Sequence, residues 1–173
     1  MTFRYRGNTK LEAAMDFDFR FIYADGAITA GTADRFAAFL NANSISPGAV
    51  VVFNSTGGLV VEAIELGKEI RKAGLSTSVK EVKAAADGTI EGPPKGCFSS
   101  CTLAFLGGVE RTVPQQALFG VHQLSTDAAM TSAQALQFGQ SAMGIIVEYA
   151  SEMGAKAQFV SELTRATLMG SIY

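Results

Sequence analysis

The segment between residues 49 and 82 most constrains the fold, because its pattern predicts two buried strands joined by a helix. Residues 49–53 form a short apolar run rich in valine, which is typical of a strand covered on both faces. Residues 60–73 have helical spacing, and residues 75–82 again favour a strand. This order predicts a parallel pair of strands with a right-handed crossover.

The same alternation continues on both sides of this segment. Residues 16–23 alternate like a half-buried strand, with aromatic side chains at every second position, and Phe36, Phe39 and Leu40 indicate a following helix. Thr29 or Thr32 is the expected cap of that helix. Residues 80–95 have the composition of a loop. After it the sequence predicts a short helix at 100–108, a strand at 117–121 and a long helix at 131–153. We predict one α/β domain over residues 1–173 with mainly parallel strands.

Composition argues against several classes of function. The 14 basic and 16 acidic side chains nearly balance, so the surface carries no strong field for nucleic acid or anionic lipid. No segment has the apolar length of a membrane span or of a signal peptide, and no GxxxxGK motif for nucleotide occurs. We therefore expect no nucleic-acid partner, no membrane span and no cofactor.

The two cysteines, Cys97 and Cys101, lie four residues apart. No CxxC pair or histidine cluster accompanies them, so we expect no metal site. Buried thiols are the favoured interpretation, and a local disulfide is the alternative, because residue type alone does not fix the required geometry.

Small residues occur at two places where a predicted strand passes into a helix. Gly57 and Gly58 let the backbone approach a substrate and direct amide hydrogens at it, although a plain tight turn is the alternative. Ser99 and Ser100 open an apolar helix, where simple capping is the alternative. In the functional interpretation Ser99 is exposed, and the amide after it joins that of Gly58 in an oxyanion hole.

His122 is the only histidine of the chain and follows the predicted strand at residues 117–121. The ends of strands are where the sites of α/β proteins gather. His122 is therefore the candidate general base for a serine hydroxyl, and a purely structural histidine is the alternative.

Taken together, three segments resemble the motifs of the Clp protease proteolytic subunit. They are STGG at residues 55–58, Ser99 with a helix that ends at Gly107 and Gly108, and His122 followed by Gln123. Ser99 lies in a CxSxC motif at residues 97–101, which makes the chain more similar to Clp-protease-like proteins described as predicted periplasmic proteins than to the protease subunit itself. The resemblance covers residue 27 to the C-terminus. The resemblance implies a Clp protease/crotonase-like spiral of strand-strand-helix units with a long C-terminal helix. It also implies homo-oligomers that assemble through residues 131–153.

The resemblance further implies a serine endopeptidase that acts on peptide or protein substrates. Ser99 is the nucleophile, since the family's serine precedes the closing glycine of its helix by nine positions, as Ser99 precedes Gly108. His122 is the base, and the backbone amides of Gly58 and Ser100 form the oxyanion hole.

The chain departs from the family at the third member of the triad, an aspartate. No carboxylate occurs between residues 163 and 173, where rough alignment reaches Thr167 and Ser171. Substitutes elsewhere in the chain are Glu162, Glu152 and Asp127. A Ser–His dyad, a backbone carbonyl partner for His122 and an inactive site are all compatible with this departure.

Three other interpretations stay open. A Ser–Lys dyad, as in signal peptide peptidases of this fold, requires a lysine such as Lys156 near Ser99, and the His-Gln motif argues against it. A crotonase-type acyl-CoA enzyme uses the same paired amides, and a catalytically degenerate oligomeric scaffold keeps only the fold. The sequence as written predicts a cytoplasmic protein, and a periplasmic one if a signal peptide was removed before residue 1.

Overall fold

The computed structural model describes residues 1–8, 20–81, 96–123, 129–165 and 171–172. The chain divides into two compact units, the first comprising Met1–Gly120 and the second Val121–Ile172. Among the described residues there are five helices, none of which has the length and apolarity needed to cross a membrane. Helices and a mixed sheet confirm the α/β class.

The first unit contains a five-stranded sheet in the order β1-β2-β3-β4-β6. Its strands are β1 (Thr2–Arg6), β2 (Phe21–Asp25), β3 (Val50–Asn54), β4 (Ser76–Val79) and β6 (Arg111–Thr112). β1 pairs antiparallel with β2, and all the other pairs are parallel. The predicted parallel arrangement is therefore confirmed, whereas the antiparallel edge strand β1 was not predicted.

The strand predicted at residues 16–23 overlaps β2, which begins at Phe21 and continues to Asp25. In β2, Ile22 and Ala24 are fully buried while Phe21 and Tyr23 are only half-buried. The two described residues of the aromatic repeat, Phe21 and Tyr23, therefore lie on the less buried face of the strand. Residues 16–19, and most of the predicted loop at 80–95, lie outside the described residues.

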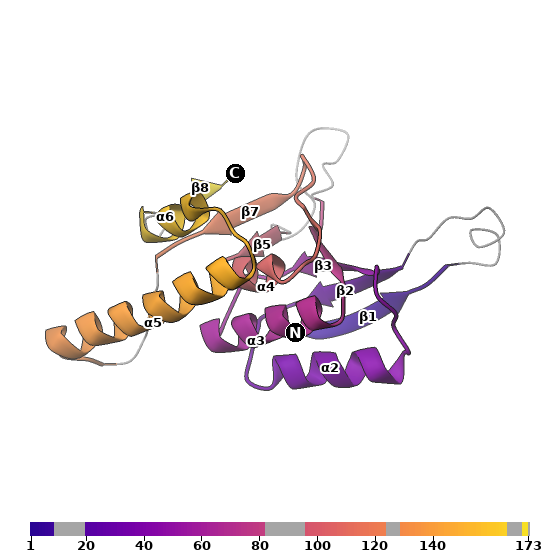
Figure 1. The fold of residues 1–173 in the computed structure, drawn as a ribbon, viewed down its shortest axis with the longest axis horizontal. Coiled ribbons are helices and arrows are strands. Elements are labelled where there is room, and N and C mark those ends of the chain that lie inside the picture. Colours follow the sequence, from indigo (N-terminus) through magenta and orange to yellow (C-terminus); the bar gives the residue numbers. More distant parts are fainter. Residues whose placement is uncertain (9–19, 82–95, 124–128, 166–170, 173) are drawn as a thin grey trace. The chain divides into compact units, whose positions relative to one another are not determined.

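Helices α2 (Thr32–Ala42) and α3 (Val60–Lys72) connect the parallel strands of this sheet and pack against each other. Figure 1 shows them side by side along the sheet. α3 confirms the helix predicted at 60–73, and its Ile64, Leu66 and Ile70 are buried in the core, as the helical spacing requires. α4 (Cys101–Leu106), which is buried along its whole length, packs on α3.

The N-terminus of α2 is capped from the neighbouring helix rather than by a threonine. The N-cap residue is Gly31, and no side-chain cap bond comes from the expected Thr29 or Thr32. Instead the Glu62 carboxylate accepts hydrogen bonds from Gly31 N–H (2.8 Å) and Ala33 N–H (3.3 Å). These two bonds satisfy donors that every helix N-terminus leaves unpaired, and they join α3 to α2.

Glu62→Gln is expected to destabilise the protein by about 1 kcal/mol at neutral pH, the usual effect of losing a helix cap. The Gly31 N–H bond, followed by that of Ala33, outweighs desolvation and lowers the Glu62 pKa from its ordinary 4.5. A lowered carboxyl pKa stabilises the fold above the ordinary value, and this stabilisation is lost as the pH falls through the folded-state pKa. Urea unfolding at pH 7 and below pH 4 should show that the difference in unfolding free energy between the wild type and Glu62→Gln is smaller at the lower pH. Glu65→Gln on the same helix, which removes only a surface pair with Lys68, is the control.

A second strand pair adjoins the sheet at the end of β3. β5 (Gly96–Phe98) pairs parallel with β7 (Leu118–Val121), and a bridge from Ser55 to Cys97 connects β3 to β5. β7 confirms the strand predicted at 117–121. This arrangement brings the end of β5 next to the Ser55–Gly58 segment.

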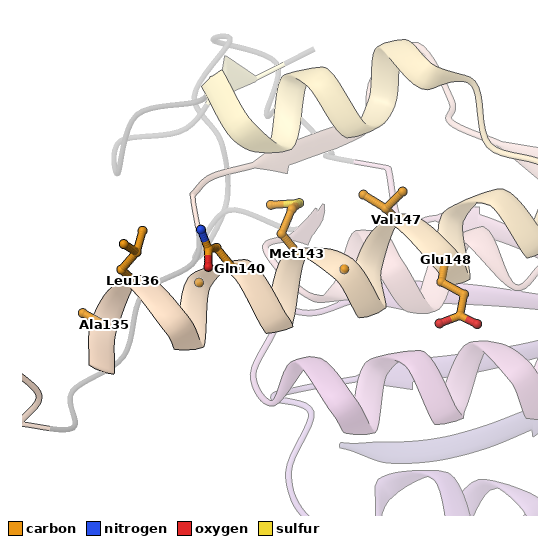
Figure 2. A pocket seen from close by; sticks show the side chains of 8 residues that line it. Ala135, Leu136, Gln140, Met143, Val147 and Glu148 are labelled. Atoms are coloured by element: carbon orange, nitrogen blue, oxygen red, sulfur yellow. The ribbon is translucent and has the colours of Figure 1, made fainter. Parts of the chain in front are cut away.

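The second unit contains α5 (Ser132–Glu152), α6 (Ala157–Arg165) and β8 (Ser171–Ile172). α5 confirms the long helix predicted at 131–153 and begins with a capping box between Thr131 and Gln134. Figure 2 shows Leu136, Met143 and Val147 along one side of α5, where they line a shallow hollow.

Candidate functional site

Ser99 stands at the turn between β5 and α4, in a conformation that non-glycine residues rarely adopt. Its φ is +57°, in the left-handed region. The Ser99 N–H donates to Gly120 O (2.9 Å), and the Ser99 carbonyl accepts from both the backbone N–H (3.0 Å) and the hydroxyl (2.7 Å) of Thr102. Such a residue costs about 1–3 kcal/mol and persists only where its surroundings enforce it. A serine on a strained strand-to-helix turn is also how hydrolases of another fold present their nucleophile.

The two glycines of the Ser55–Gly58 segment lie directly against this turn. Gly57 has φ +95°, and a Cβ added to it would lie 2.7 Å from Ser99 Cβ and 3.1 Å from Ser100 N. Gly58 has φ +144°, and its added Cβ would meet Ile28 O at 2.0 Å. Neither position accepts a side chain without movement of the backbone. The close approach expected of this glycine pair is therefore an approach to Ser99 and Ser100.

Two backbone amides beside Ser99 are available to a substrate. Ile28 N–H donates to Gly57 O (2.8 Å) and Leu59 N–H to Ile28 O (3.0 Å), so the amide of Gly58 is directed away from Ile28. On that other side, the Ser100 hydroxyl donates to Gly58 O (3.0 Å). Within the described ranges, the N–H groups of Gly58 and Ser100 have no acceptor. Unpaired amides of this kind are suited to a developing oxyanion.

Gly57→Ala is expected to disturb Ser99 more than it disturbs the fold. A positive φ destabilises alanine by about 1 kcal/mol, and the methyl group of alanine also displaces Ser99. The rate at which a fluorophosphonate labels Ser99 should fall between ~10- and ~100-fold, as for a misplacement of about 1 Å. Gly31→Ala is the matched control, since it has φ +71° but its Cβ meets only the flexible end of Arg35. Equal labelling of the two variants would contradict the expectation.

Cys97 and Cys101 form a disulfide, so the favoured interpretation of buried thiols is wrong and the alternative holds. The two Cα atoms are 5.4 Å apart, and both residues are fully buried. Spacing alone did not reveal the bond, because it depends on the tight turn at Ser99 that brings the last part of β5 beside the first residue of α4. The disulfide closes a five-residue ring with Ser99 at its centre.

A polar cluster that the sequence analysis missed lies at the carboxyl ends of β2, β3 and β4. The Asn54 side chain donates to Asp25 Oδ1 (2.9 Å) and accepts from Gly96 N–H (3.4 Å), where β5 begins. Arg4 donates to Asp25 Oδ2 (2.9 Å), and Lys80 Nζ lies 3.6 Å from Oδ1. Burial raises the pKa of Asp25, but Asn54, Arg4 and Lys80 together lower it below its ordinary value. Polar residues at the carboxyl ends of three strands were the available signal, and Asn54 links the sheet to β5.

His122 lies in the second unit, half-buried, just after β7. Its Nδ1 is 2.6 Å from the backbone carbonyl of Gln123. A carbonyl only accepts, so this contact requires the proton on Nδ1 and leaves the lone pair on Nε2 of the neutral ring. That tautomer is the one a general base needs. Its assignment as the base of Ser99 stays a prediction.

The candidates for the third member of the triad gain no support from the second unit. Asp127 and Thr167 lie outside the described residues, and only the backbone of Ser171 is described. Glu152 ends α5 with an exposed side chain, and Glu162 is half-buried on α6. Among the described residues of this unit, neither of these two carboxylates hydrogen-bonds to His122. The backbone carbonyl of Gln123 is the partner that the imidazole has.

Comparison with protein families finds no family that matches this chain, and comparison with curated proteins likewise finds no match. Within the part of the chain that the structure describes, no group of three or more potential ligand side chains is placed to hold a metal ion.

Proposed function

We propose that this chain is a serine hydrolase of peptide bonds, with Ser99 as nucleophile and His122 as general base. The observation that carries the proposal is the conformation of Ser99, held at a positive φ beside the amides of Gly58 and Ser100, which have no acceptor among the described residues. A serine that only caps a helix has no need of this conformation, which costs free energy. The resemblance of the three motifs to the Clp protease proteolytic subunit supports the same assignment.

In the proposed reaction, Ser99 Oγ attacks the carbonyl carbon of the substrate while its proton passes to Nε2 of His122. The negative charge that develops on the carbonyl oxygen is stabilised by the amides of Gly58 and Ser100, each worth about 3 kcal/mol in such a hole. The tetrahedral intermediate collapses when Nε2 returns the proton to the leaving amine, and an ester remains on Ser99. A water molecule, activated by Nε2 in the same way, then hydrolyses this ester.

Chain connectivity supports His122 as the base, since Gly120 accepts the hydrogen bond from Ser99 N–H. His122 follows Gly120 by two residues, which span at most about 7 Å. The Nδ1 contact with Gln123 supplies the orientation that an aspartate gives in a triad. The proposal is therefore a Ser–His pair with a carbonyl partner, rather than a complete triad.

Labelling with a fluorophosphonate tests the proposed nucleophile. We expect one adduct per chain, located on Ser99 by peptide mass analysis and absent from Ser99→Ala. Ser44→Ala is the matched control, because Ser44 is also a serine with positive φ (+49°) but lies in an exposed turn after α2. An unlabelled native chain, or labelling that survives Ser99→Ala, would overturn the assignment and favour a degenerate scaffold.

The finer fold assignment, a Clp protease/crotonase-like spiral, is part of the same proposal. Support comes from the strand–helix alternation and from the bridge that leads from the sheet at Ser55 into β5 at Cys97.

An oxidising compartment such as the periplasm is the proposed location, because buried disulfides persist where thiols are not kept reduced.

Self-association through α5 is proposed on the exposure of its apolar side chains. Leu136, Phe138, Ile145 and Val147 are between 42% and 65% exposed, which is unusual for one helix of a monomer. Light scattering after size exclusion should give a multiple of the 18.2 kDa chain mass. Leu136→Glu and Val147→Glu should shift it toward the monomer, and a wild-type monomer at high concentration would contradict this proposal.

A further inference from the structure

We propose that the disulfide between Cys97 and Cys101 is a positioning element for Ser99, which holds the nucleophile in its attacking conformation. This inference rests on the proposed function of Ser99. It assigns to the two cysteines a role in catalysis that goes through the backbone of Ser99 and involves no contact with the substrate.

The place of the disulfide in the chain carries the argument. Cys97 is the middle residue of β5, and Cys101 is the first residue of α4. The bond therefore fixes the end of the strand and the start of the helix at a Cα separation of 5.4 Å, and the three residues between them must turn sharply. Ser99 is at the apex of this turn and is the residue that takes the positive φ.

The remaining contacts of the turn leave the disulfide a role of its own. The amide and carbonyl of Ser99 are held by Gly120 and Thr102. The Ser100 hydroxyl fixes Gly58, whose amide is one of the proposed oxyanion donors. None of these bonds joins the strand side of the turn directly to its helix side, as the disulfide does. Without it, the left-handed conformation has fewer constraints to oppose its own cost.

Both sulfurs are fully buried, which also bears on the kind of role. A buried disulfide is shielded from solvent thiols, so it is suited to a permanent support rather than to a bond that opens during turnover. The ring it closes has only five residues, so its effect on the unfolded chain is small compared with a disulfide that closes a long loop. Its main effect is therefore expected on local geometry at Ser99.

The test compares the wild type with the double variant Cys97→Ala/Cys101→Ala, in rate of fluorophosphonate labelling and in hydrogen exchange of residues 96–106. We expect the maximal labelling rate to fall between ~10- and ~100-fold with little change in the half-saturating probe concentration. The amides of Ser99 and Thr102 should exchange faster in the variant. Leu103→Val in α4 is the matched control, which loosens the same buried helix and leaves both cysteines in place.

Labelling and exchange within twofold of the wild type would overturn the positioning role. Equal losses in the double variant and in Leu103→Val would overturn it as well, because packing alone would then explain them. If the wild type is not labelled at all, the proposed function fails, and the exchange of Ser99 and Thr102 still decides whether the disulfide holds the turn. If the double variant does not fold, it is replaced by wild-type protein that has been reduced with dithiothreitol in mild urea, which exposes the buried bond to the reagent, and then returned to buffer. That reagent donates two electrons and two protons to give two thiols and its own cyclic disulfide, and reoxidation should restore labelling.

Discussion

Gly107→Ala is expected to lower the free energy of unfolding by about 3 kcal/mol, at the upper end of the usual cost of overpacking. Gly107 directly follows α4, and a Cβ placed on it would lie 2.1 Å from the carbonyl oxygen of Gly67 and 2.6 Å from its Cα. Gly67 is buried within α3, so the atoms that the new methyl group meets belong to the backbone of a helix. No side-chain rotation relieves this overlap, and α3 and α4 must separate.

The backbone conformation of Gly107 makes the interpretation direct. Its φ is −62°, an ordinary helical value, so alanine pays no cost for a positive φ there. Gly144→Ala on α5 is the matched control, because its Cβ meets nothing within 4 Å and helix propensity predicts a gain of up to about 1 kcal/mol. Urea unfolding of the three proteins measures the difference. A Gly107→Ala variant as stable as the wild type would mean that the two helices are not in the close contact described.

The opposite outcomes expected at Gly107 and Gly144 show what a sequence reveals about its glycines and what it does not. Both were parts of predicted helical segments or their ends, and those segments were confirmed. Which of them lies against another backbone depends on the pairing of α3 with α4, a contact between residues forty positions apart. Periodicity carries no information on such contacts, because it reports only which face of an element is apolar.

The same distinction explains the outcome at the candidate site. The strand-to-helix turns around Gly57 and Ser99 were predicted from local patterns, since small residues between apolar runs have local causes. The disulfide was misjudged because it depends on the backbone conformation of the turn at Ser99, which residue types do not fix. The Asp25 cluster was missed because it joins strands that are distant in the sequence and that only the fold brings together. The prediction that Thr29 or Thr32 caps α2 was wrong for a related reason. The capping group is Glu62 of α3, which is distant in the sequence from the start of α2.

Replacing either member of the proposed Ser–His pair is expected to lower the hydrolysis of p-nitrophenyl acetate by ~10³-fold or more, the largest effect that we predict. Ser99→Ala removes the nucleophile, and His122→Ala removes the group that accepts its proton. Neither change should alter the unfolding free energy by more than about 1 kcal/mol, because both residues are half-buried and Ala at position 99 keeps the same φ cost. Stability and activity therefore separate at these two positions.

The double variant Ser99→Ala/His122→Ala distinguishes a working pair from two independent contributions. Groups that act as one unit are strongly non-additive, so the double variant should be about as slow as the slower single variant. If the two residues contributed independently, the factors by which the two single variants slow the reaction would multiply in the double variant. Retention of full activity in His122→Ala would contradict the assignment of His122 and leave Ser99 to another base, whereas full activity in Ser99→Ala would contradict the nucleophile itself. Because Nδ1 of His122 bonds a backbone carbonyl, the orienting group cannot be removed by substitution, and the double variant is the sharper measurement of the pair.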